Sequence, residues 1–122
     1  MAEPALTAQD AGALSSGRTS VMGTKAERRV ARALVVTYHE AELANLLDHV
    51  AQALDRHRAG ELDAFEVDDV IHRYKTAARE LWKFCWLGGS GANVERVART
   101  LELLTAEGER IDWWEEAAPP HR

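Results

Sequence analysis

Several features that would point to particular classes of protein are scarce in this sequence. Its 122 residues include a single cysteine, Cys85, which excludes a disulfide within the chain. No apolar run reaches transmembrane length, and the N-terminus lacks the charged and apolar regions of a signal peptide. With a formal net charge of −5, the chain as a whole lacks the excess of basic residues that is typical of nucleic-acid-binding proteins. We therefore expect a cytoplasmic bacterial protein that does not contact a membrane.

Signals for strands and breaks are equally sparse. Only three prolines and eight glycines occur, whereas alanine, leucine, glutamate and arginine dominate from Lys25 onward and favour helix. The first 23 residues are rich in small and polar side chains without periodicity, which is typical of a flexible tail. The sequence predicts an all-α fold with a flexible tail at 1–23, one helical domain at 24–116 and a C-terminal tail at 117–122.

A long first helix is predicted to begin at Thr24, where Glu27 three residues later completes a capping box, and to end before Gly60. Apolar residues at heptad positions a, d and e predict one stripe that faces the core. The residues at these positions are Val36, Leu43, Val50 and His57 at position a, His39, Leu46 and Ala53 at position d, and Ala33, Glu40, Leu47 and Leu54 at position e.

A second helix follows after a short turn. Asp63 and Glu66 form its capping box, and the helix extends to about Trp86. So short a connection predicts a long antiparallel helical hairpin, in which the numbers of facing residues add up to about 123. A third helix is expected from about residue 90 or 93 to near residue 108. Three helices leave apolar surface uncovered, so we predict a homodimer through the hairpin with a four-helix-bundle core.

Histidine and glutamate at the aromatic end of the hairpin raise the possibility of a metal centre. The hairpin register brings His39, Glu42 and Glu80 to one level, with Cys85 nearby, whereas His49 lies about two turns away. Inward carboxylates and imidazoles of this kind hold Fe, Mn or Zn in ferritin-like bundles, and a two-fold dimer would supply a second set of ligands. The commoner alternative is a hydrogen-bonded polar layer that satisfies a partly buried imidazole.

Tryptophans gather in two short segments, around residues 82–86 and 113–114. Neighbours two positions apart on a helix diverge by about 200°, so the aromatic residues of the second helix cannot share one face. Because tryptophan is enriched at binding hot spots, these residues predict an interaction surface, made of Trp82, Trp86, Trp113 and Trp114. The alternative, which is compatible with the first, is that the "DWW" segment folds back and closes a small core.

Charge is distributed unevenly along the chain. Four basic residues and one acidic residue occur within residues 25–32, and the basic patch consists of Lys25, Arg28, Arg29 and Arg32. Residues 102–116 contain six acidic residues and one basic residue, a net charge of −5. We expect the basic patch to pair with this acidic segment, within one chain or between subunits. Nucleic-acid binding by the patch is the weaker alternative.

Three segments, "YHEAELANLLDHV", "GELDAFEVDDVIHRYKTAARELWKFC" and "IDWWE", resemble a group of small actinobacterial helical proteins of uncharacterised function. The resemblance covers about residues 37–116 and implies a compact helical fold, without an activity or site residues. The residues themselves favour a non-enzymatic interaction or regulatory protein that forms a homodimer, binds an unidentified protein partner and needs no cofactor. A ferritin-like metal-binding bundle is the alternative, and a nucleic-acid-associated regulator a weaker one.

Overall fold

A computed structural model describes residues 24–87 and 91–119 of the chain. All regular secondary structure in these two ranges is helical, as the sequence predicts. The helices are α2 (Lys25–Arg58), α3 (Ala64–Trp86), α4 (Gly91–Ala106) and α5 (Trp113–Glu116). The predicted flexible tail at 1–23 and the end of the predicted C-terminal tail lie outside the described residues.

Both predicted capping boxes are present and fix where the two long helices begin. The Thr24 hydroxyl accepts from the Glu27 amide at 3.0 Å, and the Glu27 carboxylate accepts from the Thr24 amide at 2.7 Å. Asp63 and Glu66 repeat this reciprocal pair at 2.8 and 2.9 Å. Gly60, with φ of 80°, follows the end of α2 in the left-handed region that glycine adopts without a Cβ clash.

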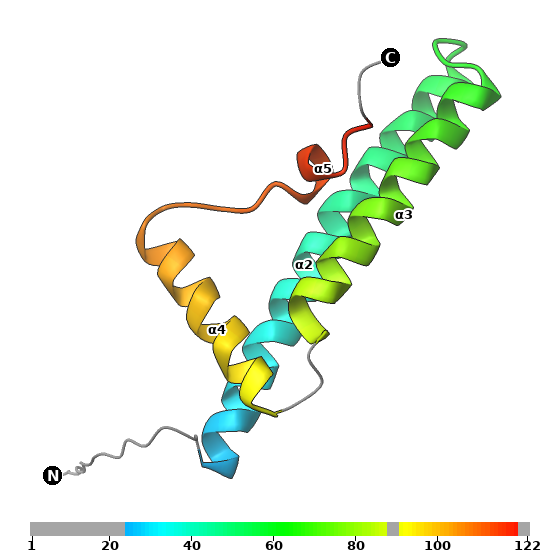
Figure 1. The fold of residues 1–122 in the computed structure, drawn as a ribbon. Coiled ribbons are helices and arrows are strands. Elements are labelled where there is room, and N and C mark those ends of the chain that lie inside the picture. Colours follow the sequence, from blue (N-terminus) through cyan, green and yellow to red (C-terminus); the bar gives the residue numbers. More distant parts are fainter. Residues whose placement is uncertain (1–23, 88–90, 120–122) are drawn as a thin grey trace, which may run out of the picture.

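The two long helices lie side by side and antiparallel (Figure 1). Contacts between them confirm the predicted register: the Tyr38 and Phe84 rings meet edge to face, and Trp86 is hydrogen-bonded to His39. The residue numbers of these pairs add up to 122 and 125, close to the predicted 123. The short connection at residues 59–63 therefore sets the level at which every other pair across the hairpin meets.

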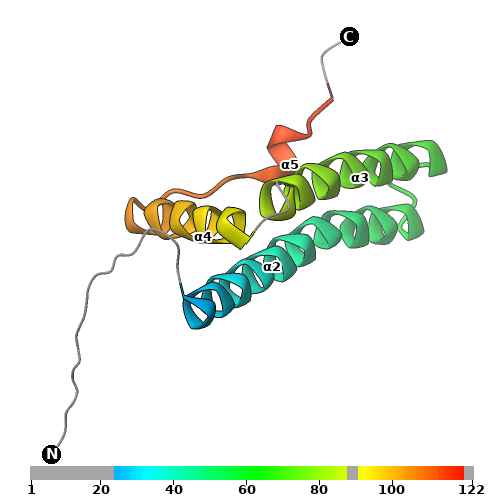
Figure 2. The same ribbon diagram turned by 60° about the horizontal axis from the view of Figure 1, so that its bottom comes forward.

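The last two helices pack along the same side of the hairpin. α4 lies against the N-terminal half of α2, beyond the end of α3, and the segment after it returns along the hairpin to α5 (Figures 1 and 2). Gly108, with φ of 69°, lies where the chain leaves α4 and turns back. The α4/α5 side is therefore covered, whereas no described element covers the opposite side of the hairpin.

The core forms where α2, α3, α4 and α5 meet. Val35, Ala77, Leu81 and Cys85 are fully buried at its centre. Val67 of α3 and Val97 of α4 are also buried, and Trp113 is only 8% exposed. The remaining buried apolar residues of this cluster are Ala31, Leu46, Ala98, Leu101 and Ala117. The "DWW" segment thus closes the core, as one of the two interpretations of the tryptophans predicted.

The predicted core stripe of the first helix is partly wrong. Leu46 and Ala53 are buried as expected, but Val36, Leu47 and Leu54 are 47%, 49% and 37% exposed. The buried face of α2 instead includes Ala31, Val35 and Glu42. The reason is that α4 and α5 pack on the side of α2 that carries Val35 and Glu42, so the side rich in large apolar residues is left bare.

Candidate functional site

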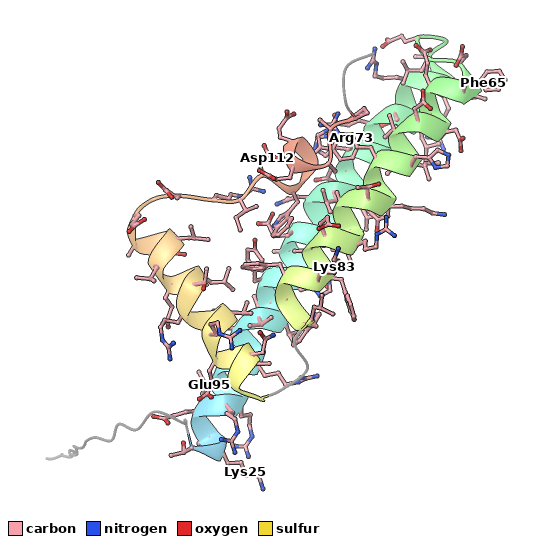
Figure 3. The ribbon with its side chains drawn as sticks, in the orientation of Figure 1. Lys25, Phe65, Arg73, Lys83, Glu95 and Asp112 are labelled. Carbon is pink, nitrogen blue, oxygen red and sulfur yellow. The ribbon has the colours of Figure 1, made fainter. Side chains whose placement is uncertain are left out.

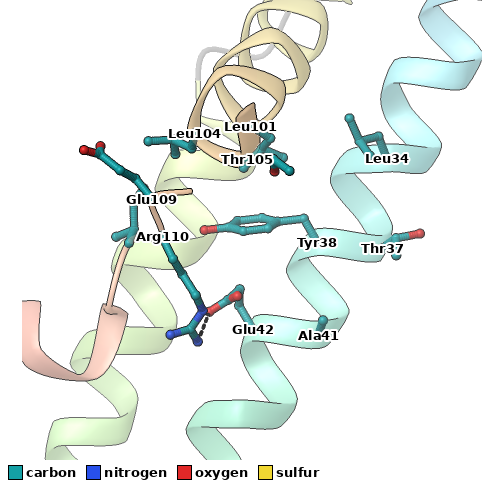
Figure 4. Close-up of a pocket in the computed structure, with 11 residues that line it drawn as sticks. Leu34, Thr37, Tyr38, Ala41, Glu42, Leu101, Leu104, Thr105, Glu109 and Arg110 are labelled. Atoms are coloured by element: carbon teal, nitrogen blue, oxygen red, sulfur yellow. Dashed lines mark hydrogen bonds and ion pairs between the residues drawn. The ribbon is translucent and has the colours of Figure 1, made fainter. Parts of the chain in front are cut away.

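A pocket of about 330 Å³ opens between α2, α4 and the segment that joins α4 to α5. Apolar and polar side chains share its walls, and the polar ones include Tyr38 and the Glu42 carboxylate, which is bonded to the Arg110 guanidinium (Figure 4). The apolar lining residues are Leu34, Ala41, Leu101, Leu104 and Ile111, and Thr37, Thr105 and Glu109 complete the pocket. Its size is at the lower end of the range for small-molecule sites.

The carboxylate of Glu42 is the only acidic group buried among the described residues. Its side chain is 10% exposed, and one of its oxygens accepts from Nη2 of Arg110 at 3.0 Å. Burying a carboxylate is costly unless a donor and an opposite charge compensate for the lost water. Arg110 supplies both, and its own side chain stays 56% exposed, so its charge remains hydrated. The pair therefore fastens the α4–α5 segment to the middle of α2.

Tyr38 occupies the wall between the pocket and the core. Its hydroxyl accepts a hydrogen bond from Nε1 of Trp113 at 2.8 Å. Burial, more than any other influence, raises the pKa of Tyr38 above its ordinary value, and the bond from Trp113 opposes this shift in part. The hydroxyl is therefore protonated at neutral pH, which makes Tyr38 a structural link to α5 and not a general base.

The structure does not bring the three predicted metal ligands together. His39 accepts at Nδ1 from Nε1 of Trp86 at 2.9 Å, so this nitrogen is occupied by a hydrogen bond. Glu42 points to Arg110 on the covered side, and Glu80 is exposed and accepts from Lys83 at 3.1 Å. No group of three or more His, Cys, Asp or Glu side chains able to hold a metal occurs among the described residues. The hydrogen-bonded alternative is the arrangement found, with Trp86 and Arg110 as the partners in place of a His–Glu bond.

Cys85 is fully buried beside this layer. Desolvation, together with the nearby Glu42 carboxylate, raises the pKa of its thiol to about 11. A nucleophilic cysteine needs a low pKa and an electropositive, accessible setting, and Cys85 has neither. It acts as a small apolar core residue.

The four predicted interface tryptophans do not form one surface. Trp113 is buried in the core, and the Trp114 ring stacks on His49 with centroids 4.1 Å apart. Arg73 secures Trp114 further: its Nε and Nη2 donate to the Trp114 carbonyl oxygen at 3.0 and 2.8 Å, and its guanidinium lies 4.3 Å from the ring centroid. Trp86 is half-buried, and Trp82 alone is exposed, at 49%.

The basic patch lines a second hollow of about 370 Å³, together with Val94 of α4. It is joined to the aromatic residues of α3, because the Arg32 guanidinium lies 5.1 Å from the Trp86 ring centroid. The expected pairing with the acidic segment of the same chain is not found among the described residues. Glu115 of that segment contacts Arg73 at 3.4 Å instead, and α5 lies far along the hairpin from Lys25 (Figure 3). Pairing between subunits remains a prediction.

The side of the hairpin opposite α4 and α5 carries a row of apolar residues on each long helix, interrupted by the exposed Glu40 and Lys75. At about 100° per residue, Leu47 lies about 180° around α2 from Tyr38, and Trp82 lies about 180° around α3 from Arg73. Tyr38 and Arg73 both contact α5, so Leu47 and Trp82 point away from α5. We call this side the bare face. Its apolar residues are Val36, Leu47, Leu54 and Trp82, which are exposed, and Leu43, Val50, Ile71 and Ala78, which are half-buried.

Three residues that organise the covered side were not recognised in the sequence. Arg73, Arg110 and Tyr38 make the contacts that hold the α4–α5 segment and α5, over sequence separations of 41, 68 and 75 residues. An arginine on a helix or in an acidic segment gives no local sign of such a distant partner. The sequence offers one hint, which is Glu42 within an apolar stretch of α2. If this carboxylate is buried, a cation from elsewhere in the chain has to compensate for its charge.

Comparison with protein-family models, curated proteins and solved structures gives no significant match. The resemblance to small actinobacterial helical proteins therefore remains a prediction. None of the helices in the described part of the chain is both long and apolar enough to cross a membrane.

Proposed function

We propose that this protein is a non-enzymatic helical interaction protein that works as a homodimer through the bare face of its hairpin. The observation that supports this most strongly is the exposure of Val36, Leu47, Leu54 and Trp82 along one side of two packed helices. Scattered exposed apolar residues are ordinary, but a stripe of large apolar residues along one side, here with the charged Glu40 and Lys75 among them, is typical of a surface that binds another protein. Tryptophan at the centre of such a stripe is a favoured binding anchor.

The chemistry of the covered side supports the same proposal. Polar groups there are paired: the buried Glu42 with the exposed Arg110, and the half-buried Tyr38 with Trp113. These contacts fasten the α4–α5 segment and α5 to one side of the hairpin, and the bare face is therefore left exposed on the other side. We propose that the contacts on the covered side stabilise the fold and that the bare face is the binding surface.

A metal centre shared across the dimer is less well supported. Glu42 lies on the covered side, bonded to Arg110, so a dimer through the bare face keeps the two Glu42 carboxylates apart. His39 is bonded to Trp86 and Glu80 to Lys83. A shared Fe, Mn or Zn site would require all three of these contacts to be exchanged for metal ligation.

A charged substitution on the bare face tests the proposal. Leu47→Glu introduces a carboxylate at a half-exposed position that a dimer would bury, whereas Leu103→Glu makes the same change at an exposed site of α4. We expect light scattering at micromolar concentration to give a dimer for the wild type and Leu103→Glu, and a monomer for Leu47→Glu. Circular dichroism checks that both variants keep their helices. A wild-type monomer, or equal behaviour of the two variants, would exclude the bare face as the dimer interface.

A further inference from the structure

We infer that two copies pack antiparallel through the bare face, with the two-fold axis crossing the hairpin near the level of position 45. This inference rests on the proposed function and specifies the partner surface: the basic patch of one copy lies against the acidic turn end of the other. The occupant of the bare face is thus a second copy of this chain, and the basic patch is part of a protein–protein interface instead of a nucleic-acid site.

The two ends of the hairpin carry opposite charge. The basic end, residues 24–32, has four basic residues and one acidic residue, a net charge of +3. The turn end, residues 55–69, has six acidic residues and two basic residues, a net charge of −4 with His57 neutral. Lys25 and Phe65 mark these opposite ends in Figure 3. A second copy placed antiparallel brings each basic end to an acidic end, and complementary charge of this kind favours one orientation over the other.

The basic patch is continuous with the bare face. Arg29 precedes Leu47 by eighteen positions, which is about five full helical turns, so the two side chains leave α2 in the same direction. Arg29 is exposed, and Arg32 reaches over the Trp86 ring on the neighbouring helix. A surface that covers the apolar stripe therefore extends naturally onto the patch.

Four of the five apolar residues that α2 contributes to the bare face are arranged symmetrically about position 45; the exception is Val50, whose counterpart is Glu40. Val36 and Leu54 are each nine positions from it, and Leu43 and Leu47 are each two positions from it. In an antiparallel pair of α2 helices centred there, Val36 meets the second copy's Leu54, and Leu43 meets its Leu47. The hairpin register places Ala78 of α3 at the same level, since 45 and 78 add up to 123. A small residue on the axis allows the two α3 helices to approach closely.

The face is large enough for a stable dimer. On α2 the face extends over about 48 Å, from Arg29 to the turn at Glu61, whereas the 23 residues of α3 contribute about 34 Å. With each helix about 10 Å wide, the face covers roughly 800 Å² per copy, which matches the area per partner in a standard interface.

A two-fold axis along the hairpin is the other symmetric choice for face-to-face packing. It would bring the two basic ends together at one end of the dimer and the two acidic ends together at the other. Like charges crowded at both ends cost free energy, so this arrangement is disfavoured.

Cysteine pairs distinguish the two arrangements. The double variant Val36→Cys/Leu54→Cys places thiols at exposed positions that meet only between antiparallel copies; within one chain they are about 27 Å apart along α2. The full-length protein is treated with a short bis-maleimide and resolved on a denaturing gel. Wild type controls for Cys85, whose thiol is buried with a pKa of about 11. Each single variant controls for chance collision.

We expect a covalent dimer in high yield from the double variant and only background from the wild type and the two single variants. Raising the salt concentration should weaken the dimer of the unmodified protein, because the contact between the charged ends is screened. No cross-link in a double variant that light scattering shows to be dimeric would overturn the antiparallel arrangement while leaving the proposed dimer intact. Equal cross-linking of a single variant would overturn it as well. A monomeric wild type would remove the proposed function and this inference together.

Discussion

Removal of the Arg73 side chain should weaken the attachment of α5 to the hairpin. Arg73 lies on α3 and makes two hydrogen bonds to the Trp114 carbonyl oxygen, at 3.0 and 2.8 Å, while its guanidinium lies 4.3 Å from the Trp114 ring centroid. A third contact, to Glu115 at 3.4 Å, involves a carboxylate that is mostly exposed. Arg73→Ala removes all three contacts and leaves that carbonyl oxygen to find water.

The expected loss follows from these contacts. Hydrogen bonds from a charged donor contribute about 1.5–3 kcal/mol, and because both bonds share one acceptor we count them as about 2 kcal/mol. The contact with the ring adds about 0.5 kcal/mol, and the exposed pair with Glu115 adds close to nothing. Arg73→Ala should therefore lower the free energy of unfolding by about 2.5 kcal/mol. Arg73→Lys keeps the charge but loses the two-pronged geometry, so it should lose roughly half as much.

Urea unfolding followed by circular dichroism measures this loss, with all proteins at one concentration because a dimer unfolds in a concentration-dependent way. Arg79→Ala is the matched control, since Arg79 is exposed on the same helix and has no hydrogen bond or ion pair within residues 24–87 and 91–119. We expect the control to lie within about 0.5 kcal/mol of wild type. Arg73→Ala that is no less stable than Arg79→Ala would refute the role of Arg73 in holding α5.

Three further predictions concern other contacts of the hairpin. Arg110→Ala should cost about 1.5 kcal/mol in urea unfolding, because it leaves the buried Glu42 carboxylate without its donor; adding Glu42→Gln should recover part of this loss, and a purely additive double variant would contradict the pairing. Trp86→Phe should cost about 1 kcal/mol, as it removes the N–H that donates to His39 while keeping an aromatic ring, and an unchanged stability would argue against that bond. The folded thiol of Cys85 has a pKa of about 11 against an ordinary 9.0, so the unfolded chain ionises first and stability falls as pH rises from 9 to 11. Over this range wild type should lose about 2 kcal/mol more than Cys85→Ala, and parallel pH profiles of the two proteins would contradict the burial argument.

Local signals predicted the helices and their pairing. Thr24 with Glu27 and Asp63 with Glu66 lie within one helical turn of each other, so capping can be read directly from the sequence. The short turn after α2 then leaves one register for the hairpin, which is why the level of His39 and Trp86 was correctly anticipated within a few residues.

The orientation of α2 could not be predicted in the same way. Large apolar residues occur on two sides of this helix, and local pattern does not say which side the rest of the chain covers. That choice depends on α4 and on the segment after it, through contacts such as Arg110 with Glu42 and Trp113 with Tyr38. Before these contacts are known, Leu47 is the better core candidate and Glu42 the better ligand candidate, and the structure reverses the first assignment.

The sequence could not decide between the metal cluster and the hydrogen-bonded layer for a related reason. Register correctly placed His39, Glu42 and Glu80 near one level, but level along a hairpin does not fix direction around each helix. His39 turns toward Trp86 and Glu42 toward the α4–α5 segment, whereas Glu80 remains on the surface of α3. To decide whether the three side chains meet, one must also know that Trp86 binds His39 and that Arg110 binds Glu42.

Sedimentation equilibrium of the full-length, untagged protein at micromolar concentration tests the central proposal most directly. A homodimer through the bare face predicts a mass of about twice the 13.5 kDa of the chain, which falls toward the monomer on dilution and at high salt. A mass of one chain at every concentration, with the helices intact, would contradict the proposal that the bare face binds a second copy.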